Sequence, residues 1–93
     1  MDTSVLLPML KTDLGITATA YDSRLTQYLQ SAEQSIREEG AVLDPSDLND
    51  MQLVVMFAAW QWRRRDSGEG MPRMLRYALN CRIFGQKAGD DDA

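Results

Sequence analysis

The segment from Asp44 to Arg65 constrains the fold more than any other part of the chain. If this segment is helical, large apolar residues cover nearly its whole circumference. Such a helix is normally enclosed by protein, so we expect either the central helix of the fold or a helix with one face buried in an assembly. One stripe comprises Leu48, Met51, Val55, Ala59 and Trp62, and the remainder comprises Leu53, Met56, Phe57 and Trp60.

Charged residues mark both ends of this helix. Asp44 can act as the N-cap and Pro45 can occupy the first helical position, which predicts a start at these two residues. Asp47 and Asp50 then complement the positive end of the helix dipole, and capping explains them without a further role. The arginines at 63–65 suit the opposite end.

Two helices are predicted before this segment. The first ends at Gly15 and contains Pro8, so we expect it either to begin close to Pro8 or to be short and bent. Its possible N-caps are Asp2, Thr3 and Ser4. The second runs from Tyr21 or Asp22 to Gly40. Its apolar stripe, at spacings of four, three and four residues, is Leu25, Leu29, Ala32 and Ile36.

A fourth helix is predicted after the polar link at 66–70. Pro72 can open it, and Gly85 and Gly89 mark its end. Its apolar face is Met71, Met74, Leu75, Ala78, Leu79 and Ile83, and its polar face includes Arg73, Arg76, Asn80 and Lys87.

These patterns predict an all-α protein, a small bundle of about four helices. We expect a short N-terminal helix, two longer central helices and a C-terminal helix within one domain at 1–88. The acidic tail at 89–93 is expected to be disordered.

Composition argues against enzyme chemistry. The chain has no histidine, and Cys81 is its one cysteine. The usual nucleophile and base pairs, zinc sites and internal disulfides are therefore not available. No glycine-rich phosphate loop is present, so we expect no catalytic, cofactor or metal site. No apolar run reaches the roughly 20 residues that span a bilayer, so we expect no membrane contact and a cytoplasmic protein.

Charge is unevenly distributed along the chain. Residues 1–62 carry three basic and nine acidic residues, a net charge of −6, whereas residues 63–87 carry seven basic and two acidic residues, a net charge of +5. The tail adds three aspartates. Such polarity favours head-to-tail contact between copies or contact with an acidic partner. The alternative is an ordinary solvated surface.

The candidate interface residues gather around the end of the apolar helix. Trp60 and Trp62 point about 200° apart on a helix and cannot enter the same core, so one of them can face a partner. Tryptophan and arginine are the residues that most often anchor interfaces. The alternative is that both rings pack inside a bundle. The candidates are Trp60, Trp62, Arg63, Arg64, Arg65, Met71, Arg73 and Arg76.

The same arginines are also suited to contact nucleic-acid phosphates. Against this, the chain has a net charge of −4, whereas DNA-binding domains usually show a basic footprint. The segment at 41–46 is also longer than the tight turn of a helix-turn-helix motif. A small DNA-binding regulator is therefore the alternative reading.

A family resemblance covers most of the chain, from about Lys11 to Lys87. The stretch LVVMFAAWQWRRRDSGEGMPRMLRYALNCRIFGQK resembles the last two helices of phage head-tail connector proteins of the gp6-like family. The most specific part is the MPRMLR segment, which opens a helix of the MPRMLRYALN type. The earlier LGITATAYDSRLTQYLQSAEQSI looks like the first major helix of that family and its lead-in.

The resemblance implies a non-enzymatic structural subunit. Its partners would be copies of itself in a ring, dodecameric on the portal, together with the portal protein and a tail-completion or stopper protein. DNA would pass through the lumen without sequence-specific binding. The protein would act in the host cytoplasm during assembly and then at the head-tail junction of the virion. Another phage morphogenesis adaptor of the same helical design is the remaining alternative.

Overall fold

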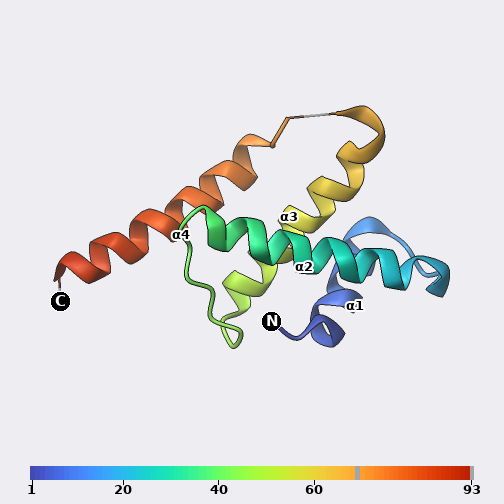
Figure 1. The fold of residues 1–93 in the computed structure, drawn as a ribbon, viewed down its shortest axis with the longest axis horizontal. Helices are drawn as coiled ribbons and strands as arrows, with labels where there is room; N and C mark the ends of the chain where they lie inside the picture. The colour runs from blue at the N-terminus through green and yellow to red at the C-terminus, as the bar shows by residue number, and fades with distance from the viewer. Residues whose placement is uncertain (69, 93) are drawn as a thin grey trace.

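The computed structural model describes residues 1–68 and 70–92, with the side chains of 1–65, 68 and 70–84. This part of the chain forms four α-helices and one short 3-10 helix and contains no strand, which confirms the all-α prediction (Figure 1). The elements are α1 (Thr3–Leu14), η1 (Thr19–Tyr21), α2 (Asp22–Glu38), α3 (Leu48–Ser67) and α4 (Arg73–Asp92).

The first three α-helices pack against one another, and α3 is also the main neighbour of α4. In Figure 1, α2 crosses in front of α3, and α4 runs away from this group toward the lower left. The long apolar helix is thus the central one, because it contacts all the other α-helices.

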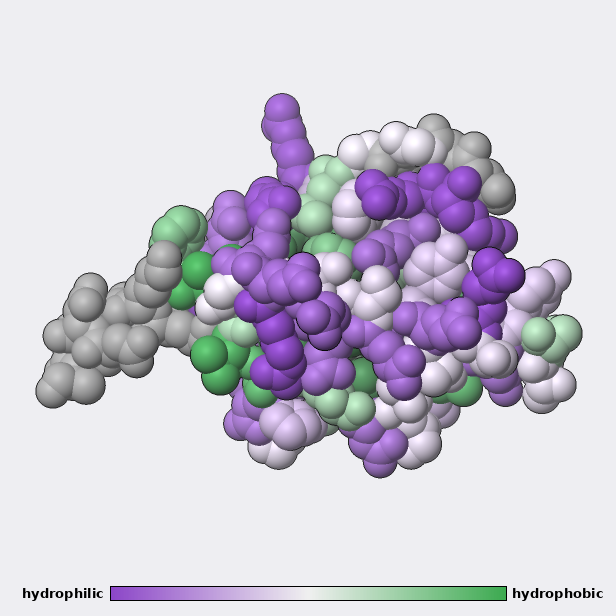
Figure 2. All heavy atoms as spheres, viewed as in Figure 1, coloured by the Kyte–Doolittle hydropathy of each residue, from purple (hydrophilic) through white to green (hydrophobic). Residues whose placement is uncertain are grey.

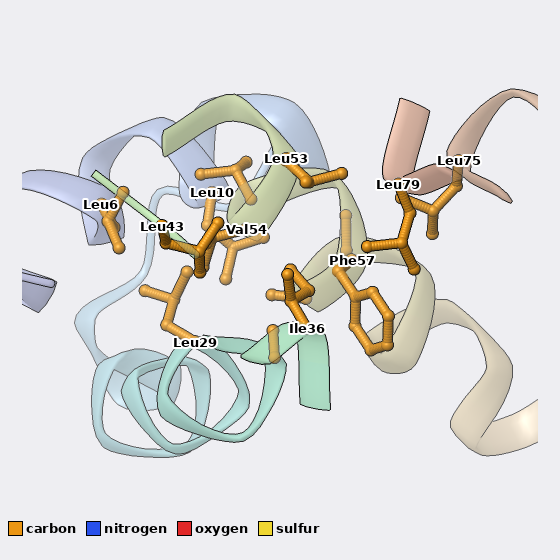
Figure 3. Packing of buried hydrophobic residues seen from close by; sticks show 14 of the residues in the cluster. Leu6, Leu10, Leu29, Ile36, Leu43, Leu53, Val54, Phe57, Leu75 and Leu79 are labelled. Carbon is orange, nitrogen blue, oxygen red and sulfur yellow. The ribbon is translucent and has the colours of Figure 1, made fainter. Parts of the chain in front are cut away.

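The core lies between α3 and its neighbours. Phe57 of α3 sits between Ile36 of α2 and Leu79 of α4, which joins the fourth helix to the rest (Figure 3). The predicted stripe of α2 is fully buried. The core residues are Leu6, Leu10, Leu25, Leu29, Ala32, Ile36, Ala41, Leu43, Leu53, Val54, Val55, Phe57, Ala58, Ala59, Leu75, Leu79 and Ile83.

The start of α3 differs from the prediction at Asp44. The helix begins at Leu48, and Asp47 is the N-cap, accepting a hydrogen bond from the Asn49 amide at 2.8 Å. Asp44 instead closes a turn, because its carboxylate accepts hydrogen bonds from the Ser46 hydroxyl at 2.7 Å and the Ser46 amide at 2.9 Å. Aspartate favours such local turns over helix.

Helix α1 runs without interruption through Pro8. It begins after Asp2, which caps the Ser4 amide at 2.9 Å, and ends at Gly15 in the left-handed conformation. The expectation of a helix starting close to Pro8 is therefore wrong. Leu6 and Leu10 flank the proline and are both buried, so core packing outweighs the lost backbone hydrogen bond.

Helix α4 follows Pro72, whose carbonyl accepts the Arg76 amide at 3.0 Å, and continues past Gly85 and Gly89 to Asp92. Met74 does not lie on its buried face as predicted, because its side chain is 79% exposed. For the acidic tail, residue 93 and the side chains of 89–92 lie outside the described part, so the expected disorder stays a prediction.

Candidate protein-binding surfaces

Trp60 and Trp62 both pack within the subunit. The Trp62 ring meets Tyr21 and Tyr28 edge-on, at centroid distances of 5.7 and 5.6 Å. The Trp60 ring meets Phe57 edge-on at 5.3 Å, and its indole nitrogen donates to the Gly70 carbonyl at 3.1 Å. Both side chains remain partly exposed. Each ring therefore keeps a surface available to a partner, while its body belongs to the fold.

The guanidinium groups of Arg64 and Arg65 lie over these rings. Arg64 is 4.6 Å from the Trp60 centroid, and Arg65 is 3.7 Å from the Trp62 centroid. Cation–π contacts of this kind contribute about 0.5–1 kcal/mol each at exposed sites. They restrict the two long side chains, so less conformational entropy is lost when a ligand binds.

The remaining predicted interface residues differ in their surroundings: some form contacts within the subunit, and Arg73 is exposed to solvent. Arg63 approaches an Asp13 carboxylate oxygen at 3.6 Å, and Arg76 bonds the Glu39 carboxylate at 2.8 Å, so both link elements of one subunit. Arg73 is exposed and forms no ion pair with a described residue. Met71 is partly buried against the core.

A second apolar row on α4 faces away from the core. Met74, Tyr77, Cys81 and Phe84 recur at spacings of three, four and three residues, the pattern of a helix that meets another helix. Met74, Tyr77 and Phe84 are 79%, 72% and 61% exposed, and Cys81 is exposed too. Hydrogen bonding with the Cys81 thiol raises the pKa of the Tyr77 phenol. We call this row the outer stripe.

The sequence prediction missed the outer stripe as a separate surface. Its residues interleave with the buried row of Leu75, Leu79 and Ile83, and the sequence prediction placed Met74 on one apolar face together with that row. The heptad spacing of the outer four residues was the signal that distinguishes the two rows.

The sequence prediction also missed a buried ion pair that fixes α4. Asp50 was assigned only a helix-start role, but it is 1% exposed and is the one buried charged residue of the described part. Its carboxylate contacts the Arg82 guanidinium at 2.7 and 2.8 Å and accepts the Asp44 amide at 2.8 Å. Arg82 also donates to the Val42 carbonyl at 3.2 Å. The pair joins the α2–α3 loop, α3 and α4.

The described residues contain no group of three or more His, Cys, Asp or Glu side chains arranged to hold a metal ion. No helix in the described ranges combines the length and apolar character needed to cross a membrane. Comparison with known proteins found no matching family model, and it found no curated protein and no solved structure with significant similarity to the chain.

Proposed function

We propose that this chain is a structural head-tail connector subunit of a tailed phage or prophage. It forms a ring of identical copies between the portal and the tail-completion proteins, and DNA passes through the lumen. The observation that carries the proposal is the double-faced character of α4. Leu75, Leu79 and Ile83 bury one row in the subunit core, and the outer stripe presents a second row to the surroundings.

An exposed methionine and aromatic row suits an assembly subunit. Met, Tyr and Phe are enriched where proteins meet, and contiguous exposed apolar surface on a small protein marks an interaction site. Met74, the first residue of the stripe, also lies in the segment with the most specific connector resemblance, residues 71–76. In a ring, each copy uses two different surfaces, so an outward face on α4 paired with another part of the next copy meets the geometric requirement.

The test is assembly of particles with a subunit changed only in the outer stripe. Met74→Glu combined with Tyr77→Glu should leave the free energy of unfolding within about 0.5 kcal/mol, because both side chains are exposed. Particles should then accumulate as filled heads without tails. Val5→Glu places the same charge on an exposed residue of α1 and should give normal particles. Normal tailed particles from the double variant would contradict the proposal.

The DNA-binding regulator is favoured by the exposed arginines at 63–65. Titration with duplex DNA at two salt concentrations separates the two functions. Phosphate binding weakens steeply as salt rises. The connector proposal predicts weak binding at the lower salt concentration, whereas tight binding to one sequence would support the regulator.

A further inference from the structure

A basic pocket lies between α2 and α3, with a volume of about 560 Å³. Four residues on the α2 side and four on the α3 side line the pocket. Both sets have spacings of three, one and three residues, so each wall is one face of its helix. Figure 2 shows strongly hydrophilic side chains gathered on the right of the view, over the C-terminal part of α3 and the beginning of α2. The lining residues are Arg24, Gln27, Tyr28, Ser31, Gln61, Arg64, Arg65 and Gly68.

Two of the arginines that line the pocket, Arg24 and Arg64, have no ion pair within the described part of the subunit. The described lining of the pocket contains three arginines and no carboxylate. Most other basic side chains are paired within the subunit, at distances of 2.7 to 3.6 Å. Those paired side chains are Lys11, Arg37, Arg63, Arg76 and Arg82.

The pocket is also organised in advance. The Trp60 and Trp62 rings hold the guanidinium groups of Arg64 and Arg65 on the α3 wall. The side-chain oxygen of Gln61 is buried and has no hydrogen-bond partner among the described residues. A buried acceptor without a partner is rare, and a donor such as a backbone N–H of a bound segment would satisfy it, whereas a carboxylate would not.

We infer that this pocket receives the acidic segment Asp90–Asp92 of a neighbouring copy. The segment carries three consecutive aspartates, and carboxylates are the groups that arginines such as Arg24 and Arg64 bind in paired hydrogen bonds. The net charge of −4 disfavours a nucleic-acid phosphate as the ligand.

The acidic segment and the pocket lie at opposite ends of the molecule. Figure 1 shows α4 carrying the chain to the far left of the view, whereas α2 begins and α3 ends on the right. The long dimension is 47 Å, so the segment reaches the pocket of the next copy and not its own. Copies joined in this way contact one another head to tail, which closes a ring when the rotation allows. The inference rests on the proposed function in this respect.

A peptide of residues 86–93 tests the inference with the purified chain. The receiving chain carries Asp90→Asn, Asp91→Asn and Asp92→Asn, so that its own segment does not compete, and tryptophan fluorescence reports binding. Arg24→Glu with Arg64→Glu should weaken binding of the peptide about tenfold or more, because charged hydrogen bonds are lost. A peptide with asparagine at residues 90–92 should bind the unchanged pocket more weakly, to a similar degree. Val5→Glu, which adds a negative charge at an exposed residue of α1 outside the pocket, should leave binding unchanged.

Equal binding of the aspartate and asparagine peptides would overturn the inference, and so would displacement of the peptide by millimolar inorganic phosphate, which would indicate a phosphate site. The peptide experiment uses only the purified chain, so its result is independent of the particle-assembly experiment. If the peptide binds as expected while particles assemble normally with the outer-stripe variant, only the connector proposal fails. If that variant blocks tail joining and the peptide does not bind, only the pocket inference fails.

Discussion

Arg82 holds α4 in place through contacts with two separate parts of the chain. Its guanidinium reaches Asp50 on α3 and the Val42 carbonyl in the α2–α3 loop. Replacing it with methionine leaves the Asp50 carboxylate buried without its cation. Loss of one partner of a buried pair costs about 3–5 kcal/mol. Because the Arg82 side chain is 32% exposed and water reaches it, we expect the lower end, a loss of about 3 kcal/mol in the free energy of unfolding by urea.

The double variant Arg82→Met with Asp50→Asn is the control for this prediction. It removes the buried charge along with its partner, and it should recover a large part of the lost stability. If the single variant loses less than about 0.5 kcal/mol, the pair acts as a surface salt bridge and does not position α4.

Gly40 allows the chain to turn from the end of α2 into the loop that leads to α3. Its φ is +108°, which side chains rarely adopt, and a Cβ there would lie 4.0 Å from the Ile83 Cγ2 atom. That distance is ordinary contact, so the expected cost of Gly40→Ala comes from backbone strain and amounts to about 1–3 kcal/mol. Gly70→Ala meets no atom within 4 Å and has no left-handed φ, so thermal unfolding should show little change. Equal stability of the two variants would contradict this account.

Asp44 gives the turn before α3 a pH dependence. Hydrogen bonds from the Ser46 hydroxyl and then the Ser46 amide lower the pKa of Asp44 below its ordinary value of 3.8. The folded pKa is below the unfolded one, so this contribution to stability is complete above the unfolded pKa and is lost as pH falls through the folded pKa. Ser46→Ala should raise the Asp44 pKa toward 3.8 in an NMR titration. An unchanged pKa would show that the hydroxyl does not bond the carboxylate in solution.

At the level of helices, the predictable features were those that local spacing determines. The α2 stripe from Leu25 to Ile36 has one apolar side, and all four of its residues are buried as expected. The start of α3 was not predictable, because Asp44 and Asp47 are equally good caps and the choice depends on Asp50. Asp50 binds the Asp44 amide, and its own burial depends on Arg82, 32 residues away.

Pro8 should weaken α1 in spite of the packing around it. It has no N–H to donate to the Ser4 carbonyl, and an interior proline costs a helix about 3 kcal/mol. Part of this is offset because proline also restricts the unfolded chain, by about 0.4–1 kcal/mol. Pro8 is exposed, so Pro8→Ala should raise the free energy of unfolding by about 2 kcal/mol, measured in urea.

Pro72→Ala is the matched control for Pro8→Ala. Pro72 precedes the first turn of α4, where no backbone hydrogen bond is lost to proline. This change should therefore have little effect on stability. A stabilisation of the same size in both variants would show that the gain does not come from the interior of α1.

Across the whole molecule, the sequence located one wall of the candidate site and not the other. The arginines and tryptophans at 60–65 are adjacent in the chain, so their clustering was visible. Arg24 completes the basic pocket from α2, about 40 residues earlier, and nothing in its local sequence indicates that contact. The fold alone brings the two walls together, because α2 packs against α3.

The division between core and surface leads to a prediction about assembly. Leu29 is buried in α2, so Leu29→Asp places an unpaired charge in the core at a cost of several kcal/mol and should unfold the subunit. Val55→Asp should do the same in α3. Arg64→Glu with Arg73→Glu changes two exposed side chains without an ion pair among the described residues, so it should leave a folded monomer that assembles poorly.

Circular dichroism and gel filtration distinguish these outcomes before any particle is made. The aspartate variants should lose helical signal, whereas the arginine variant should keep it and elute as a single folded species. Particles grown with the arginine variant should then lack joined tails, because reversed charge repels the acidic surface that the arginines meet. A folded double variant that builds normal particles would show that these arginines are solvated surface, and the assembly contact would then have to lie in the outer stripe alone.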